Sequence, residues 1–213
     1  MKNNPLIIIA SVFILFLCMG TQCYKEYPPP KYTFIEKLNL FPAKKVYHIG
    51  DTIWVQYNNV GKKLFDYKSG LQIPVDTISI PFMIGFNAIY NYAASPVGGF
   101  CDFVSSNGIN VGRYLGDFGT SDFQNFGCNT NNSFDFKVGV VLKKTGIYSL
   151  DLFYGSRYIS TCSNSFSNYV DGTLEYYFNV PDCNKDIYLT IPRASGYIIN
   201  QIDSKKAFLI KVE

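Results

Sequence analysis

The stretch SFDFKVGVVLKKTGIYSLDLFY, residues 133–154, indicates the fold class of this chain. Apolar and polar residues alternate along its first half, and successive side chains of a β-strand point to opposite faces. The alternation resumes at Tyr148, after a Lys-Lys-Thr-Gly turn. We therefore predict a β-hairpin over residues 134–154. Its buried face is expected to contain Phe136, Val138, Val140, Leu150 and Leu152.

Similar alternation elsewhere predicts strands over residues 34–40, 52–58, 76–86, 173–180 and 207–212. A short helix is expected within residues 195–204. The dipeptides Asp171-Gly172 and Asn107-Gly108 are typical of two-residue hairpin turns, and a content of 17 Tyr and 18 Phe suits sheets. Many short strands in one domain predict an all-β fold, an immunoglobulin-like antiparallel β-sandwich with long loop insertions.

Two aromatic residues bear on the type of sandwich. Tyr148 follows Gly146 and Ile147, which resembles the tyrosine corner of immunoglobulin-like domains, where the hydroxyl binds nearby backbone. A Tyr that simply packs in the core is the alternative. Trp54 is a candidate for the inward Trp of a sandwich. The apolar residues 78–100 contain Pro81 and several Asn, so we expect a strand and a loop there, not a membrane span.

The N-terminus has the features of an export signal. Lys2 precedes a run of 12 apolar residues, LIIIASVFILFL, which as a helix spans only about 18 Å. This pattern resembles a bacterial lipoprotein signal, in which the first mature residue is a diacylated Cys. Residues 1–22 would then be the signal peptide, Cys23 the lipid attachment site, residues 23–33 a Pro-rich tether, and residues 34–213 one domain. Gln22 departs from the usual small residue before that Cys, which leaves open ordinary cleavage after Gly20.

The mature chain keeps four cysteines, an even number in an exported protein: Cys101, Cys128, Cys162 and Cys183. Such a count favours disulfides, and no CxxC spacing suggests zinc. We predict sequential pairing, the first with the second and the third with the fourth, because each pair brackets a turn-rich segment. Buried free thiols are the alternative. No metal or other cofactor is expected.

Residues 100–129 are the candidate recognition loop, because they mix aromatic residues with Gly, Ser and Asn as antibody paratopes do. The candidate ligand-binding residues are Arg113, Tyr114, Asp117 and Asp122. Alternatively, the Phe residues of this segment form a small satellite core. Asp117 and Asp122 could also be the catalytic pair of a hydrolase. A calcium site is not expected, because they lack the regular ligand spacing of a calcium-binding loop.

Charge and catalytic motifs exclude several functions. With 19 basic and 16 acidic side chains and no long charged block, the chain lacks a nucleic-acid surface. His48 is the only histidine, and no nucleophile motif accompanies it, so no catalytic residue is assigned. The Lys-Lys pairs beside strands indicate protection of sheet edges, with contact to an anionic surface as the alternative.

Three segments carry a family resemblance: YHIGDTIWV from Tyr47, LFDYKSG from Leu64, and AFLIKVE from Ala207. They are similar to uncharacterised lipoproteins of Bacteroidota. The resemblance implies a cell-envelope lipoprotein with an immunoglobulin-like sandwich, and no activity. In those bacteria an Asp-Thr-Ile triplet resembles an O-glycosylation acceptor, which residues 51–53 and 76–78 both match.

The expected protein is therefore a non-enzymatic lipoprotein at the bacterial outer membrane or cell surface. It would contact the lipid bilayer through its acyl anchor and bind a glycan or an envelope protein. A structural accessory subunit of an envelope complex is the second hypothesis. A hydrolase that uses Asp residues of the 101–128 loop is the third.

Overall fold

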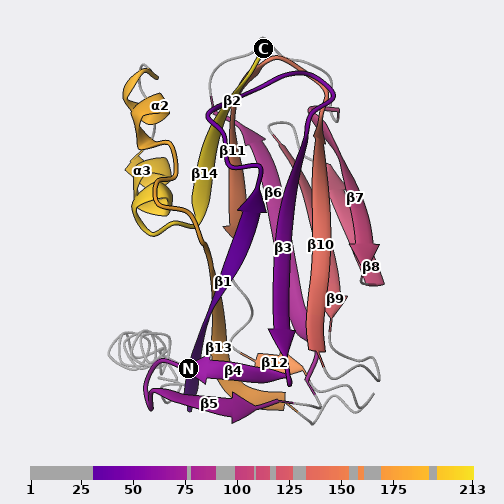
Figure 1. Cartoon of the computed structure of the whole chain (residues 1–213), viewed down its shortest axis with the longest axis vertical. Helices are drawn as coiled ribbons and strands as arrows, with labels where there is room; N and C mark the ends of the chain where they lie inside the picture. The colour runs from indigo at the N-terminus through magenta and orange to yellow at the C-terminus, as the bar shows by residue number, and fades with distance from the viewer. Residues whose placement is uncertain are drawn as a thin grey trace, which may run out of the picture.

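The computed structural model of the chain is shown in Figure 1. It describes residues 31–75, 78–89, 99–107, 109–115, 119–126, 133–153, 158–160, 169–191 and 196–213. Strands predominate in this part of the chain, as the alternating sequence predicts, and they form two sheets. The all-β prediction is confirmed.

The first sheet has the strand order β12-β13-β1-β3-β10-β7 among the described residues. These strands are β12 (Tyr158–Ser160), β13 (Tyr169–Phe178), β1 (Tyr32–Phe41), β3 (Thr52–Val60), β10 (Ser133–Leu142) and β7 (Cys101–Asn107). A hairpin of β4 (Lys63–Asp66) and β5 (Leu71–Pro74) is joined to β1 at the lower end of the molecule in Figure 1.

The second sheet has the order β2-β14-β11-β6-β9-β8. Its strands are β2 (Val46–Tyr47), β14 (Ala207–Val212), β11 (Gly146–Phe153), β6 (Ile80–Ala88), β9 (Gly119–Phe126) and β8 (Ile109–Leu115). Helices α2 (Lys185–Leu189) and α3 (Gly196–Asp203) lie beside β14, at one edge of this sheet (Figure 1). The predicted short helix is confirmed by α3.

The core lies between the two sheets, as in a β-sandwich. Phe82 of the second sheet packs on Phe136 of the first, with ring centroids 4.5 Å apart. Phe178 and Phe208 make a similar contact between β13 and β14. The five residues predicted for the buried face of residues 134–154 are all buried. The strand predictions over residues 34–40, 52–58, 173–180 and 207–212 are also confirmed, within a few residues at the ends.

The predicted hairpin over residues 134–154 is wrong, although both of its strands exist. β10 pairs with β3 and β7 in the first sheet, whereas β11 pairs with β14 and β6 in the second. The short turn between them therefore crosses from one sheet to the other. A crossing and a hairpin both turn the apolar side chains of the two strands toward one core. Alternation alone consequently cannot distinguish them.

The two dipeptide turns are also wrong as hairpins. Asp171 and Gly172 lie inside the continuous strand β13, where Gly172 pairs with Tyr32 of β1. A Cβ atom at Gly172 would lie 3.2 Å from the side chains of Phe34 and Tyr32, so close packing explains this Gly. The strands on either side of Asn107-Gly108 lie in different sheets. Gly108 itself is outside the described residues.

Three further features differ from the prediction. The sandwich is not purely antiparallel, because β13 runs parallel to β1 and β2 runs parallel to β14. Trp54 points outward, since its neighbours Ile53 and Val55 on β3 are buried in the core. Residues 100–129 are not one long loop, because β7, β8 and β9 occupy most of them. β7 and β8 are edge strands, where polar composition is tolerated.

The segment that begins at Ile78 forms strand β6 over Ile80–Ala88, as predicted, while residues 76–77 lie outside the described part. Among the described residues, no helix combines the length and apolar composition that crossing a bilayer requires. The hydroxyl of Tyr148 donates a hydrogen bond to the backbone carbonyl of Thr145, at 3.1 Å. The Tyr148 side chain is also buried in the core.

Candidate functional site

The predicted contact residues lie on two neighbouring strands of the second sheet. Arg113 and Tyr114 are on β8, and Asp122 is on β9. In the backbone register Arg113 pairs with Asp122, and Tyr114 pairs with Ser121. The structure describes these positions by their backbone alone. Asp117 lies outside the described residues, so the structure places three of the four candidates, on adjacent strands.

The register connects Tyr114 to a polar group nearer the centre of the sheet. Ser121, the partner of Tyr114, pairs with Gly85 of β6, and Gly85 pairs with Asp151 of β11. Tyr114 and Asp151 thus belong to one row that runs across four strands. Neighbouring strands lie about 4.8 Å apart, so the two backbones are about 14 Å from each other. A ligand the size of a short oligosaccharide spans such a distance.

Asp151 is the centre of a cluster of three polar side chains, which we call the Asp151 cluster: Asn87, Ser149 and Asp151. The amide nitrogen of Asn87 donates to Oδ2 of Asp151 at 2.6 Å. The hydroxyl of Ser149 donates to Oδ1. The inward neighbours Leu150 and Leu152 are buried in the core, which places the cluster on the outer face of the sheet.

Burial raises the pKa of Asp151, and the two hydrogen bonds only partly oppose this effect. Among the described residues, no lysine or arginine forms an ion pair with Asp151. A carboxylate has about four acceptor sites, and the cluster fills two of them. Two acceptor sites of the Asp151 carboxylate therefore have no partner among the described residues.

An aromatic side chain lies next to the cluster. A Cβ atom on Gly85 would be only 2.4 Å from Cε2 of Phe153, so the ring of Phe153 lies across the Gly85 backbone. The absence of a side chain at Gly85 makes room for this ring. Phe153 is half-buried and shares the outer face of β11 with Ser149 and Asp151. The site thus combines an apolar ring with hydrogen-bonding groups.

A second carboxylate with a raised pKa, Glu36, has a structural role. Burial is the main cause of the shift, and hydrogen bonds from Phe65 and Tyr57 oppose it. The backbone N–H of Phe65 donates to Glu36 at 3.2 Å. Asn59 donates to the hydroxyl of Tyr57 and to the carbonyl of Lys63. This network joins β1, β3 and β4, so its donors are already committed to the fold.

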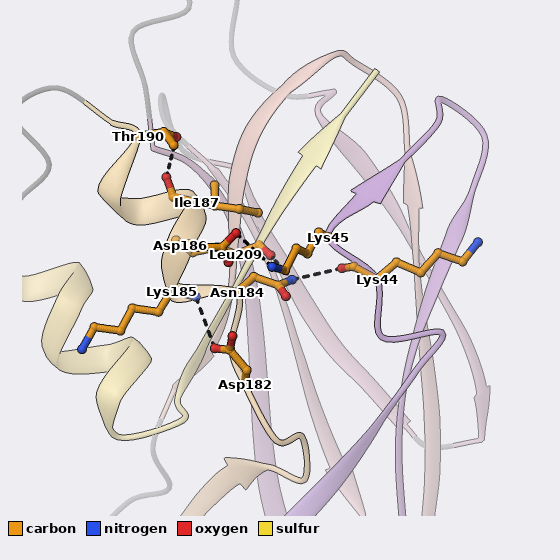
Figure 2. Close-up of polar contacts among 9 residues, drawn as sticks. All are labelled: Lys44, Lys45, Asp182, Asn184, Lys185, Asp186, Ile187, Thr190 and Leu209. Atoms are coloured by element: carbon orange, nitrogen blue, oxygen red, sulfur yellow. Dashed lines mark hydrogen bonds and ion pairs between the residues drawn. The ribbon is translucent and has the colours of Figure 1, made fainter.

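A third polar cluster fixes α2 to the second sheet (Figure 2). The side chain of Asn184 donates to the carbonyls of Lys44 and Leu209, at 3.0 and 2.7 Å. Lys45 forms an exposed ion pair with Asp186 at 2.9 Å. Asn184 has a φ of 58°, a left-handed conformation that Asn adopts more readily than most residues. These contacts satisfy one another, so the cluster holds the helix in place.

No disulfide occurs among the described residues. Cys101 is buried at the start of β7. Cys183 is a buried thiol beside α2, where burial raises its pKa to about 11 and makes it a poor nucleophile. The predicted partners Cys128 and Cys162 lie outside the described residues, as does Cys23. Both disulfides and the lipid attachment therefore stay predictions.

The remaining sequence candidates are surface features or contacts of the scaffold. His48 is exposed in the turn before β3. Within the part of the chain that the structure describes, no group of three or more His, Cys, Asp or Glu is arranged to hold a metal ion. The Lys-Lys pairs include Lys143, which pairs with Asp102, and Lys206, which pairs with Glu175. The Asp151 cluster was missed as a site, although the alternation correctly predicts that Asp151 points away from the core.

The fold and the cluster define an all-β protein of two facing sheets with a polar site on one outer face. No family model matches the chain, and no curated protein or solved structure is significantly similar to it.

Proposed function

We propose that this protein is an exported, lipid-anchored and non-enzymatic envelope module that binds a glycan on the outer face of the second sheet. The observation that carries the proposal is the Asp151 cluster, a desolvated carboxylate beside an aromatic ring, with two acceptor sites that no described residue fills. Ligand sites typically combine an apolar surface with a few well-placed polar groups.

The chemistry of the cluster suits a sugar better than an anion. A sugar hydroxyl donates one hydrogen bond and accepts others, and the carboxylate of Asp151 accepts while the amide of Asn87 can do both. The carboxylate would repel an anion. The apolar ring of Phe153 offers a surface for the C–H face of a sugar ring. Tyr114, in the same row of the sheet, is the proposed outer contact, because Tyr often carries interface energy.

The anchor is proposed from the leader. A short apolar run ends near Cys23, where a polar and Pro-rich segment begins. Two acyl chains on Cys23 would give stable attachment, whereas one chain is marginal. The proposed location of the anchored protein is the bacterial outer membrane or cell surface. The mass of the mature N-terminus tests it, because diacylated Cys23 differs in mass from a chain that starts at Thr21.

We also propose that the sandwich is of the immunoglobulin-like class. The bond from the Tyr148 hydroxyl to the Thr145 carbonyl, at the start of β11, supports this assignment. An experimental structure that shows the immunoglobulin strand connectivity, or a different one, decides the question.

The binding proposal is tested on a glycan array with the full-length protein and the variant Asp151→Asn. Loss of the charge should weaken retention of a bound glycan at least tenfold, because the hydrogen bonds to the sugar become weaker. Asp102→Asn is the matched control, since Asp102 is a half-buried residue of β7 in the first sheet, away from the Asp151 cluster. If Asp151→Asn retains the glycan as the parent does, or if the parent binds no glycan, the proposal is wrong.

A further inference from the structure

Exposed apolar side chains are concentrated at the β4–β5 hairpin. Phe65, Tyr67 and Leu71 are 37%, 69% and 61% exposed. Val60, immediately before the hairpin, is 77% exposed. Tyr is typical of the interface between water and a membrane, because its ring is apolar and its hydroxyl can stay in water.

The exposed charges of the hairpin are positive. Residues 63–74 contain three charged side chains, Lys63, Asp66 and Lys68, and both lysines are exposed. Asp66 is only 2% exposed, because its carboxylate is turned into the hairpin. The surface that the hairpin offers is therefore apolar and basic. Lysine side chains can cover apolar surface while they hold the ammonium group near lipid headgroups.

The hairpin is rigidly attached to the first residues of β1. The carboxylate of Asp66 accepts the backbone N–H of Thr33 at 2.8 Å, and the N–H of Tyr67 donates to the carbonyl of Thr33 at 2.7 Å. Figure 1 shows the start of β1 beside β4 and β5 at the lower end of the molecule. The chain thus enters the domain next to its exposed apolar residues.

The length of the preceding chain brings this end of the domain close to the proposed anchor. Eight residues lead from Cys23 to Lys31, which is the first described residue. Even when fully extended they span no more than about 30 Å. An anchored chain would hold the hairpin within reach of the bilayer at a high effective concentration, so that a weak contact becomes significant.

We propose that the β4–β5 hairpin is a membrane-contact element that rests on an anionic lipid surface through Tyr67 and Leu71, at and beside its turn, with Lys63 and Lys68 beside the headgroups. The inference rests on the proposed anchor at Cys23. It sets the orientation of the domain, with the hairpin toward the bilayer.

The test uses protein expressed from the full-length sequence and isolated from membranes. Mass spectrometry first establishes whether Cys23 is acylated. The protein is then placed in vesicles of phosphatidylcholine with one quarter phosphatidylglycerol, and hydrogen–deuterium exchange of residues 63–74 is compared with that in detergent. We expect at least fivefold slower exchange in vesicles, and a smaller difference at high salt because the charges are screened.

Two double variants make the result specific. Tyr67→Ser with Leu71→Ser should abolish the slower exchange. Phe41→Ser with Val46→Ser is the matched control, because these residues are also exposed but lie outside the hairpin, and it should leave the slower exchange intact. All four residues are on the surface, so both variants are expected to fold, and thermal denaturation verifies this.

The outcomes separate the two proposals. If Cys23 is acylated but exchange is no slower in vesicles, the membrane contact is wrong and the anchor stands. The same holds if the hairpin variant keeps the slower exchange. Slow exchange in detergent that grows with protein concentration identifies a second copy of the chain as the occupant and also overturns it. A mature N-terminus without acylated Cys23 removes the anchor and this inference with it.

Discussion

Asp66 in the β4–β5 hairpin and Asp151 on the outer face of the second sheet are both covered carboxylates that accept a hydrogen bond from a serine hydroxyl. Their pKa values nevertheless move in opposite directions. Hydrogen bonds from Ser69 and from the backbone of Thr33 lower the pKa of Asp66 to about 2. Burial raises the pKa of Asp151.

The difference lies in the source of the donors. Asp66 accepts backbone N–H groups from Thr33, Lys68 and Ser69, so folding of the chain itself satisfies the charge. The donors to Asp151 among the described residues are side chains, and they leave acceptor sites open. A carboxylate satisfied by backbone supports the fold. A desolvated carboxylate with incomplete partners is a candidate for binding.

The largest expected effect comes from the same Leu→Ala change made in each region. Leu150 is fully buried next to Asp151, so Leu150→Ala should lower the free energy of unfolding by about 2–5 kcal/mol. Leu71, at the hairpin, is exposed, and Leu71→Ala should change the free energy of unfolding by less than about 0.5 kcal/mol. Urea denaturation measures both. Equal losses of stability in the two variants would show either that Leu150 of β11 does not face the core or that Leu71 of the hairpin does.

Substitution of one glycine in each region separates steric contact from backbone strain. A Cβ on Gly85 would lie 2.4 Å from the Phe153 ring, so Gly85→Ala should displace the ring, cost about 1–3 kcal/mol and weaken glycan binding. Gly70 has open space but a φ of +68°, so Gly70→Ala should cost about 1–2 kcal/mol through backbone strain alone. Glycan binding should be unchanged in Gly70→Ala. A Gly85→Ala protein that binds like the parent would exclude Phe153 from the site.

Removal of each charge should have opposite effects on stability at neutral pH. Asp66→Asn should lower the melting temperature, because the amide cannot replace a carboxylate that accepts four hydrogen bonds. Asp151→Asn should keep or raise it, because a desolvated charge is removed while a polar group remains. Thermal unfolding followed by circular dichroism gives both values. A lower melting temperature in Asp151→Asn alone would reverse the assignment of roles.

The smallest expected effect is in the pH dependence of stability. Because the folded pKa of Asp66 is below its unfolded value of 3.8, its contribution is complete above that value and is lost as pH falls toward about 2. Because the folded pKa of Asp151 is raised, the stability that it affects decreases as pH rises through the range just above 3.8. In Asp66→Asn, the urea midpoint should no longer show the loss of stability toward low pH. In Asp151→Asn, it should no longer show the loss of stability as pH rises above 3.8. Parallel curves for the variants and the parent would contradict both shifts.

Local features of the fold follow from the sequence more readily than pairing does. Alternation correctly predicts that Leu150 is buried and that Asp151 points outward, since both depend only on the two-residue repeat. It does not predict that β10 and β11 lie in different sheets, because long-range pairing determines the partner of each strand. Polar composition concealed the strands within residues 100–129. Two of them, β7 and β8, are edge strands, which need little apolar sequence.

The candidate site could be predicted only in part. Tyr114 and Asp122 lie on adjacent strands of the second sheet, so composition indicated a relevant region. Asp151 and Asn87 are 64 positions apart in the chain and meet only through the pairing of β6 with β11. No short motif signals such a pair. The hydrogen bond from the backbone of Thr33 to Asp66 also joins separate segments of the chain, so no local motif predicts it.

The most direct test of the contrast between the two carboxylates is a pH titration of their side-chain carbon signals by NMR, with Asp66→Asn and Asp151→Asn used for assignment. We predict a midpoint near 2 for Asp66 and a midpoint above 3.8 for Asp151. Midpoints for both residues at the ordinary value of about 3.8, or in the reverse order, would contradict the division into a structural and a ligand-binding carboxylate.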